Sequence, residues 1–353
     1  MYSRALGLTA GLLLLVVAVC FPEGAFANVQ AEIRMRRNAQ ECPRSCVPVT
    51  DCPMFAPPLP EWTLKTKMQF KKRVCERLGN NRYTVCCPKQ GLELLDLESC
   101  GPSSSYRIAN GKKAKLFQFP WMALLKSKSG GFCCSGTLVS EQYVLTAAHC
   151  IKDCEPTMIR LGEFDLRNTT DCDSKGEVCA PPPQDIPIEE VINHPYYSNR
   201  RKENDIGLIR LSRKATKNDN VATICLPVSP MMRTTQSKYV VAGWGKTESM
   251  ESSDMLLYST FSLTPKDECQ TALRVEDAYI KINDNQLCAM GDNRSDNCLG
   301  DSGGPLKTFG ISARMVQYGV VSYGLKTCGK QIAPGVYARV ESYIDWILGE
   351  MTE

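Results

Sequence analysis

Short apolar runs separated by turn-forming residues cover most of the chain after residue 108. Trp-Met-Ala-Leu-Leu at 121–125 and Tyr-Val-Val-Ala at 239–242 are two of these runs. Many short strands bounded by turns are typical of a β-barrel or a β-sandwich. Near the C-terminus the apolar spacing changes to three and four residues, which predicts a helix packed on this β structure. The apolar residues of that helix are Val340, Tyr343, Ile344 and Ile347.

The N-terminus has a different pattern. Arg4 precedes an unbroken apolar run at 12–19, and the small-x-small sequence Ala25-Phe26-Ala27 follows it. This order is typical of a secretory signal peptide, here residues 1–27. A membrane anchor is the alternative, but the run is shorter than the roughly 20 residues that span a bilayer. We therefore expect a secreted, extracellular protein with no membrane span.

Composition narrows the class of protein. The 353 residues are 43% hydrophobic and 23% charged, values typical of a globular chain of two or three units. The net charge of +4 is small. Nucleic-acid binding would need a concentrated basic face, so no nucleic-acid partner is expected.

The cysteine count indicates disulfides. The chain has 19 cysteines, and Cys20 would leave with the signal peptide, so 18 remain. An even number in a secreted chain predicts a full disulfide set. Zinc binding is the rival interpretation, but the chain has 2 histidines and lacks paired Cys-x-x-Cys spacing.

Cysteine spacing also divides the chain. Residues 28–40 form a polar, basic leader, and residues 41–88 form a cysteine-dense module too small to bury much core. Its six cysteines allow 15 pairings. A basic run at 65–73 is either a solvated face or a partner-binding face. Residues 89–107 form a linker whose Gly-Pro-Ser-rich end is suited to proteolysis, and residues 108–353 form the β domain.

One glycine-rich turn carries candidate chemistry. The stretch Gly-Asp-Ser-Gly-Gly-Pro at 300–305 presents the hydroxyl of Ser302. A serine needs a base and a third group that orients the base. His149 ends an apolar run, whereas His194 lies in a turn before a proline, so His149 is the better base. The candidate carboxylate is Asp205, which precedes another apolar run.

Together these residues resemble the chymotrypsin-like serine proteases, because His149, Asp205 and Ser302 stand in that family's order. The resemblance runs from about residue 107 to the C-terminus. The other matching motifs lie at 134–138, 242–245, 322–324 and 334–337. The resemblance implies an all-β fold of two packed six-stranded antiparallel barrels with the site between them, and a C-terminal helix.

The resemblance also implies roles for the site residues. Ser302 would be the nucleophile, His149 the base and Asp205 its partner, with the backbone N–H groups of Gly300 and Ser302 forming the oxyanion hole. Asp296 would form the floor of a pocket for Arg or Lys. Gly324 and Gly335 would form the walls of that pocket. No cofactor is required for this chemistry.

Two further resemblances concern the cysteines. The module at 41–88 resembles the clip domain of arthropod proteases, which implies the pairs Cys42–Cys86, Cys46–Cys75 and Cys52–Cys87. The protease resemblance implies Cys134–Cys150, Cys269–Cys288, Cys298–Cys328 and the linker bridge Cys100–Cys225. Cys172 and Cys179 enclose a short loop and are expected to pair. Cys133 and Cys154 are then left to pair with each other.

These features predict a secreted zymogen that is activated by a cut between Arg107 and Ile108. The new amine of Ile108 would pair with Asp301. The clip resemblance indicates a trypsin-like protease of an immune cascade, in melanisation or Toll signalling, acting in haemolymph. Downstream zymogens, an upstream activating protease and a serpin would be its partners. A catalytically weak adaptor is the alternative, and a digestive trypsin is disfavoured by the clip module and its disulfide tether.

One acidic loop predicts a further site. The loop at 163–171 offers Glu163, Asp165, Asn168 and Asp171, a density of oxygen ligands that suits Ca²⁺. An exposed acidic loop without metal is the alternative. Asn168 and Asn293 also begin N-glycosylation sequons.

Overall fold

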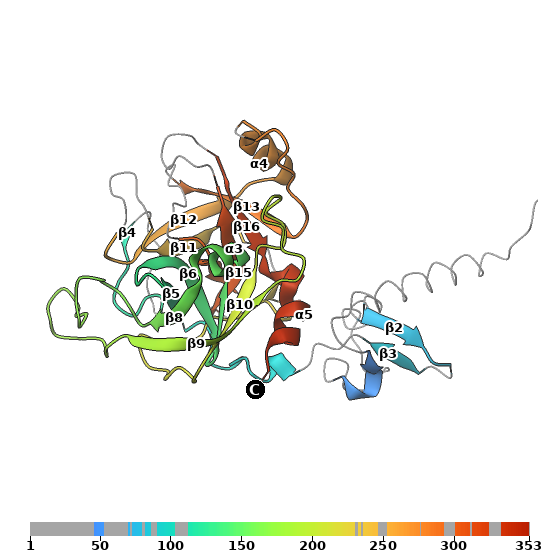
Figure 1. The fold of residues 1–353 in the computed structure, drawn as a ribbon, viewed down its shortest axis with the longest axis horizontal. Coiled ribbons are helices and arrows are strands. Elements are labelled where there is room, and N and C mark those ends of the chain that lie inside the picture. Colours follow the sequence, from blue (N-terminus) through green and yellow to red (C-terminus); the bar gives the residue numbers. More distant parts are fainter. Residues whose placement is uncertain are drawn as a thin grey trace, which may run out of the picture. The chain divides into compact units, whose positions relative to one another are not determined.

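The computed structural model divides the chain into two units, Met1–Cys87 and Pro88–Glu353 (Figure 1). The described residues are 46–52, 70, 73–79, 82–85, 90–102, 112–229, 232–233, 236–245, 253–275, 277–292, 301–310, 313–324 and 333–352. The predicted signal peptide and leader lie outside them. No helix of the described part is long and apolar enough to cross a membrane.

The N-terminal unit contains a small antiparallel sheet in the order β1-β3-β2. Its elements are β1 (Val47–Pro48), the 3₁₀ turn η1 (Val49–Asp51), β2 (Val74–Arg77) and β3 (Tyr83–Val85). Cys52, Val74 and Val85 form its buried core, and a disulfide joins Cys46 to Cys75. Since few apolar side chains are buried in the described part of this unit, we expect cross-linking to supply part of its stability.

The second unit begins with a closed six-stranded barrel in the order β10-β7-β6-β5-β8-β9. All of its neighbouring strands are antiparallel. The strands are β5 (Met122–Ser127), β6 (Phe132–Ser140), β7 (Tyr143–Thr146), β8 (Pro156–Leu161), β9 (Gln184–Asn193) and β10 (Gly207–Leu211). The short helix α3 (Ala148–Cys154) follows β7 directly.

The remaining strands form a second barrel in the order β11-β14-β15-β16-β13-β12, which the β11–β12 pairing closes. The strands are β11 (Tyr239–Gly243), β12 (Leu257–Leu263), β13 (Gln286–Gly291), β14 (Pro305–Phe309), β15 (Met315–Tyr323) and β16 (Gly335–Arg339). β4 (Lys112–Lys113) pairs with the outer side of β12. The helical segments are η4 (Gln90–Leu92), α4 (Lys266–Leu273) and α5 (Val340–Glu350).

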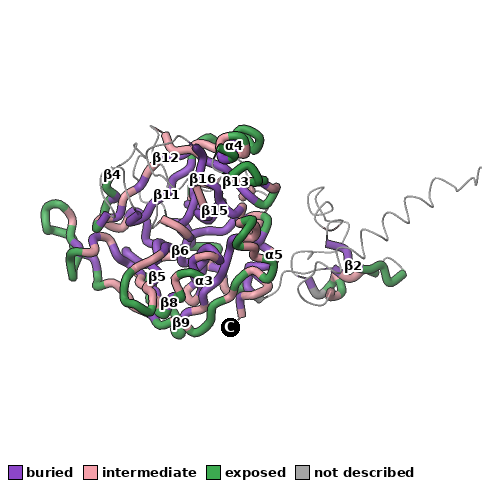
Figure 2. Tube along the Cα trace, turned by 45° about the horizontal axis from the view of Figure 1, so that its top comes forward, coloured by how far each residue is buried: buried purple, intermediate pink, exposed green. Residues whose placement is uncertain are grey.

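One apolar cluster runs through both barrels and the C-terminal helix. It contains Leu125 and Leu145 of the first barrel, Val240 and Val320 of the second, and Ile344 of α5. Figure 2 shows the buried chain inside the barrels and the exposed chain in the loops around them. The predicted barrels and the predicted helix are therefore confirmed.

The structure forms six of the nine expected disulfides. These are Cys46–Cys75, Cys100–Cys225, Cys133–Cys154, Cys134–Cys150, Cys172–Cys179 and Cys269–Cys288. The other three expected pairs include Cys42, Cys86, Cys87, Cys298 and Cys328, which lie outside the described residues. Among described side chains, the one cluster with metal-ligand spacing is His149 with Cys134 and Cys150. Those two cysteines are bonded to each other, so they leave no thiolate for zinc.

A lysine is buried in the second barrel. Lys307 of β14 is 0% exposed, and its Nζ has no hydrogen-bond partner in the described part of the chain. The ammonium lies 4.4 Å from the centre of the Phe119 ring. Burial lowers the pKa of Lys307 to about 7, and the charge of Asp301 acts in the opposite direction. Below that pH the folded chain has to hold a buried charge that the unfolded chain keeps in water.

We therefore expect Lys307→Met to raise the melting temperature of the protein. The gain should be about 2–4 °C for each kcal/mol recovered. It should be larger near pH 6 than near pH 9, because at about pH 9 the folded wild type no longer carries this charge. Calorimetry at both pH values measures the effect, with exposed Lys175→Met as the control. A shift that is the same at both pH values would contradict this explanation.

Candidate active site

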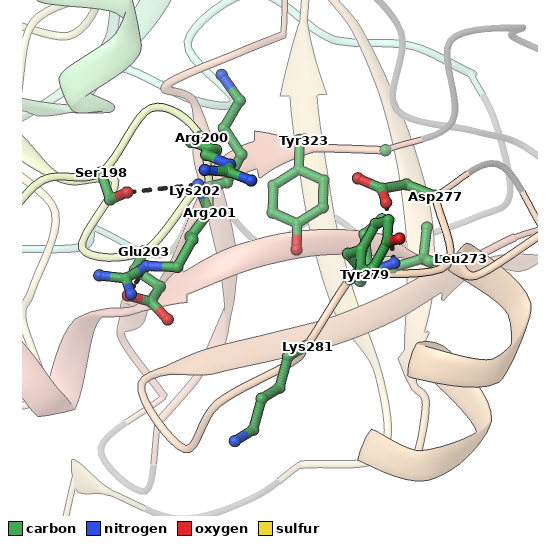
Figure 3. Close-up of a pocket in the computed structure, with 12 residues that line it drawn as sticks. Ser198, Arg200, Arg201, Lys202, Glu203, Leu273, Asp277, Tyr279, Lys281 and Tyr323 are labelled. Carbon is green, nitrogen blue, oxygen red and sulfur yellow. Dashed lines mark hydrogen bonds and ion pairs between the residues drawn. The ribbon is translucent and has the colours of Figure 1, made fainter.

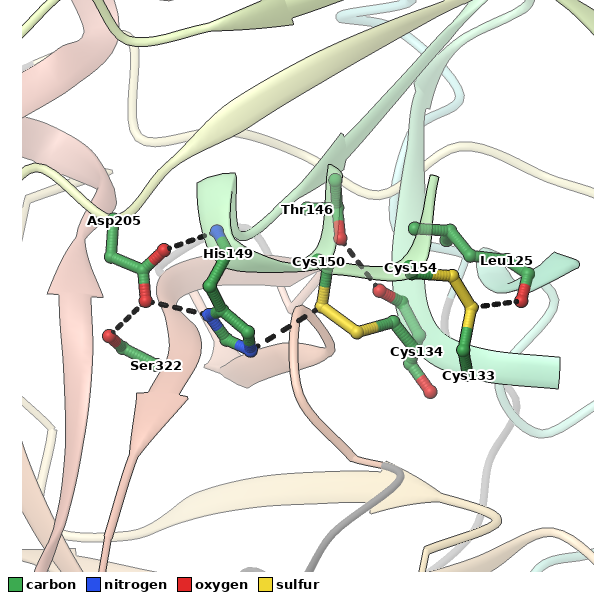
Figure 4. The surroundings of a disulfide bond; sticks show 10 residues. Leu125, Cys133, Cys134, Thr146, His149, Cys150, Cys154, Asp205 and Ser322 are labelled. Atoms are coloured by element: carbon green, nitrogen blue, oxygen red, sulfur yellow. Dashed lines mark hydrogen bonds and ion pairs between the residues drawn. A yellow bond between two sulfur atoms is a disulfide. The ribbon is translucent and has the colours of Figure 1, made fainter. Parts of the chain in front are cut away.

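The best-defined polar contact of the site joins His149 to Asp205. His149 lies in the first turn of α3, just after β7, and Asp205 lies just before β10. β10 pairs with β7 through Gly207 and Thr146, and this register brings the two side chains together. His149 Nδ1 lies 2.8 Å from Asp205 Oδ2, and the backbone N–H of His149 donates to Oδ1 at 2.9 Å (Figure 4).

The contact between His149 and Asp205 is largely buried, and its chemistry determines which atom carries the proton. The Asp205 side chain is 1% exposed and that of His149 is 15% exposed. An ionised carboxylate only accepts hydrogen bonds, so Nδ1 of His149 carries the proton that it donates to Asp205. Nε2 is then unprotonated and can accept a proton from a hydroxyl group. The imidazole is thus held in the tautomer that a general base needs.

Ser322 of β15 completes the environment of this carboxylate, and the sequence prediction missed its role. Its hydroxyl donates to Asp205 Oδ2 at 2.5 Å. The serine is 5% exposed, so solvent does not compete for the bond. Ser322 belongs to the motif at 322–324 that carried the family resemblance, and that motif was its one signal in the sequence.

The turn that presents Ser302 is fixed between the two barrels. The Ser302 carbonyl accepts the N–H of Ser135 in β6 at 2.8 Å, and the N–H of Gly303 donates to the Val321 carbonyl in β15 at 2.9 Å. Gly303 has a φ of +81°, and a Cβ there would lie 2.3 Å from the Ser135 oxygen. A side chain at position 303 would clash with Ser135, so this position of the turn requires glycine.

Ser135 connects the nucleophile to the base. Its carbonyl accepts the hydroxyl of Thr146 at 2.8 Å, and the neighbouring Cys134 is bonded to Cys150, next to His149. The segments that carry Ser302 and His149 are therefore tied together. In this uncut chain, Ser302 Oγ makes no hydrogen bond to His149 among the contacts of described residues. Such contacts often tighten only when substrate binds.

Asp301 lies against the end of β11. Its Oδ1 accepts the N–H of Gly245 at 3.0 Å, and a Cβ at Gly243 would lie only 1.9 Å from the same oxygen. Side chains at these two positions would displace the carboxylate. The cut-site residues Arg107 and Ile108 lie outside the described residues. The pairing of Asp301 with the new amine therefore stays a prediction.

Two of the three predicted substrate-pocket residues are described. Gly324 and Gly335 lie side by side, because a Cβ at Gly324 would come within 3.9 Å of the Gly335 Cα. Their lack of side chains leaves space next to Ser322. Asp296 and Gly300 lie outside the described residues, so the roles of the pocket floor and of the oxyanion N–H stay predictions.

The other histidine serves packing. The turn expected at His194 is present, but its ring is half-buried rather than solvent-exposed, because it packs against α5. The ring centre lies 5.3 Å from that of Tyr343 and 5.0 Å from that of Trp346. Burial lowers the pKa of His194 to about 4, so the ring is neutral at physiological pH. No sequence pattern near His194 indicates this contact, because the partners lie about 150 residues further along the chain.

Comparison with known proteins decides the family. The family profile described as Trypsin matches residues 108–347. The chain belongs to the trypsin family of serine proteases. The protein is therefore a serine endopeptidase of the trypsin type.

Its relatives in this family include insect proteases with a clip domain. The chain is 39% identical over 319 residues to phenoloxidase-activating factor 3 of Holotrichia diomphalia, covering 86% of this chain and 90% of the relative. It is 36% identical over 306 residues to serine protease grass of Drosophila melanogaster, covering 80% of each. The crystal structure of the drosophila Grass clip serine protease of the Toll pathway matches with a TM-score of 0.67 and 34% identity, covering 86% of this chain and 93% of that one.

The acidic loop of this trypsin-family domain fits a calcium ion only in part. Both oxygens of Asp165 accept hydrogen bonds from Arg167, at 2.8 and 2.6 Å, so this carboxylate is already neutralised. Glu163 and Asp171 are buried, 7% and 5% exposed. Burial raises the pKa of Glu163 and the charge of Asp171 adds to the shift, while the backbone N–H of Phe164 and the Arg160 guanidinium, 3.3 Å away, oppose it without cancelling it. A cation between these two carboxylates would relieve that cost. Calcium binding stays a prediction with Glu163 and Asp171 as its fitting ligands.

We expect Glu163→Gln to stabilise the protein in chelator at neutral pH. With a raised pKa, Glu163 favours folding below its unfolded pKa, and this contribution is lost as pH rises through the folded value. At neutral pH the ionised side chain is therefore unfavourable, and glutamine removes the charge. The melting temperature should rise by about 2–4 °C for each kcal/mol. Calcium should stabilise wild type and not the variant, with Glu177→Gln as an exposed control from the neighbouring loop between Cys172 and Cys179. No effect of calcium on wild type would contradict the metal prediction.

Proposed function

We propose that this serine protease is a secreted zymogen that cleaves after Arg or Lys in an extracellular immune cascade. The observation that supports this most is the buried Asp205–His149 pair beside the fixed turn of Ser302. A chain that served only as a binding adaptor would have no need of an imidazole oriented by a buried carboxylate. The adaptor alternative is therefore not favoured.

The proposed reaction is acyl transfer. Ser302 Oγ attacks the carbonyl carbon of the peptide bond while His149 Nε2 takes its proton. The resulting imidazolium donates that proton to the leaving amine, and Asp205 stays ionised and stabilises the imidazolium charge. The N–H groups of Gly300 and Ser302 would stabilise the oxyanion, each worth about 2.7–4 kcal/mol of barrier in comparable sites. Water then releases the acyl group by the same steps.

The relatives support the cascade role by name. They include a phenoloxidase-activating factor, a Spaetzle-processing enzyme and a melanization protease. By analogy, the substrates are downstream zymogens or similar protein precursors, an upstream protease supplies the activating cut, and a serpin ends the activity. Secretion into haemolymph follows from the predicted signal peptide and from the same analogy.

Specificity is tested with the cut, activated protein and fluorogenic peptides ending in Arg, Lys or Gln. Arg and Lys peptides should be cleaved, and the Gln peptide should not. Asp296→Ser should lower kcat/KM on Arg by a factor of about 100 or more, since a buried cation would lose its partner. Ser302→Ala is the control for contaminating proteases. Wild-type cleavage after Arg by Asp296→Ser would contradict the assignment of the pocket floor.

Activation is tested on the same chain. The Cys100–Cys225 disulfide joins the segment before the cut to the protease domain. Cut protein should therefore run as one band without reductant and as two bands with it. Arg107→Gln should stay uncut and inactive. Asp301→Asn should be cut but inactive, because the carboxylate that would pair with the new amine is gone. Full activity of uncut Arg107→Gln would overturn the zymogen scheme.

A further inference from the structure

A groove lies beside the proposed active site, and the proposed reaction and activation assign it no role. Its volume is about 1170 Å³. Three segments line it: the loop before Asp205, the segment after α4, and the end of β15 (Figure 3). The lining residues that carry the argument are Arg200, Arg201, Lys202, Tyr279, Lys281 and Tyr323.

Two residues that line the groove, Tyr323 and Gly324, directly follow Ser322 in the chain. The hydroxyl of Ser322 binds Asp205. Burial raises the pKa of Tyr323 to about 12, and the charge of Asp205 adds to this shift. Gly324, which lines the groove, is also a predicted wall of the arginine pocket. A peptide whose arginine occupies that pocket therefore has neighbouring residues within reach of the groove.

The groove carries more positive than negative charge. Its charged residues are Arg200, Arg201, Lys202, Lys281, Glu203 and Asp277. Arg201 is paired with Glu203 at 3.0 Å, and Asp277 accepts the backbone N–H of Tyr279 at 2.9 Å. Within the described part of the chain, Arg200, Lys202 and Lys281 have no carboxylate partner. Lys202 Nζ donates to the amide oxygen of Asn199 at 2.6 Å, a bond that leaves its charge uncompensated, so all three charges can still attract an acidic ligand.

The loop that presents two of these cations has a fixed backbone. The N–H of Ser198 donates to the Glu203 carbonyl at 3.0 Å, and the Asn204 amide donates to the Tyr196 carbonyl at 2.9 Å. The Gln286 side chain of β13 donates to the Lys202 carbonyl at 3.1 Å. These contacts hold the loop against the second barrel, so the cations lie on the groove wall rather than on a free segment.

We propose that this groove selects substrates with Asp or Glu in the few positions before the cleaved bond, and that Arg200, Lys202 and Lys281 provide this selectivity. The inference rests on the proposed endopeptidase function and adds a requirement on the substrate. An extended peptide advances about 3.3–3.6 Å per residue, so a short segment spans the groove from Gly324 outward. Because the cations are partly exposed, each should contribute a modest, salt-sensitive factor of about two to five.

The test uses cut, activated protein and matched fluorogenic peptides that end in Arg. The positions two to four residues before the cut carry Glu, Gln, Lys or Phe, one set at a time. We expect kcat/KM in the order Glu above Gln above Lys, with a Glu-to-Gln ratio of about 8 to 125 at low salt, the product of three such factors. The ratio should fall toward one as salt is raised.

Variants identify the residues responsible. Arg200→Gln, Lys202→Gln and Lys281→Gln should each lower the Glu-to-Gln ratio by about two- to fivefold, and the triple variant should bring it near one. Exposed Arg213→Gln, outside the groove lining, is the matched control and should keep the wild-type ratio. The ratio is the readout because a merely structural role would lower both rates together.

The other possible results would each contradict the proposed acidic selectivity. Equal rates on Glu and Gln peptides, a preference for Phe, or a wild-type ratio in the triple variant would overturn the acidic selectivity. Cleavage of neutral arginyl peptides would show in those cases that the proposed function still holds. If activated protein cleaved none of the arginyl peptides, the proposed function would fail and this inference would fail with it.

Discussion

The site depends on one buried carboxylate that is satisfied from several directions. Asp205 accepts bonds from the backbone and ring of His149 and from the hydroxyl of Ser322. With 1% of its side chain exposed, an ionised Asp205 would be costly without these donors. The donors come from both barrels, since His149 follows β7 and Ser322 lies in β15. The packing of the two barrels against each other therefore determines the orientation of His149.

The covalent framework supports the same arrangement. Cys134–Cys150 joins β6 to α3 beside His149, and Ser135 of the same strand binds the Ser302 turn. Cys100–Cys225 joins the linker to the protease domain. These cross-links reduce the freedom of the unfolded chain and hold segments far apart in sequence at the site. A cut at the predicted site would therefore leave the segment that contains Cys100 attached to the protease domain.

Much of the fold and of the catalytic site could be predicted from the sequence, for physical reasons. Short apolar runs indicated a β-barrel or a β-sandwich, and the family resemblance implied two barrels. Apolar spacing of three and four residues indicated α5, and two histidines left few choices for the base. The sequence did not reveal Ser322 as a partner of Asp205, because a serine in an apolar strand has no local mark of what it faces. Lys307 is similar: a lysine between β-strand neighbours gives no sign of complete burial.

The groove beside the active site is the feature that the sequence was least able to predict. Arg200 and Lys281 are about 80 residues apart, and each resembles an ordinary exposed cation in the sequence. Only the fold brings both to the groove that Tyr323 also lines. The same holds for the acidic loop, where composition suggested four oxygen ligands but Arg167 occupies Asp165. Charge counts along a chain do not determine which charges are already paired.

The role of Asp205 in orienting His149 is tested most directly by replacing the buried carboxylate with its neutral isostere. Asp205→Asn keeps the size of the side chain but presents an N–H group to His149, which favours the wrong tautomer. In the cut protein, kcat on an arginyl peptide should fall by about 10⁴-fold at neutral pH while the melting temperature changes little. A loss of less than about tenfold in a folded, fully cut variant would show that Asp205 does not orient the base.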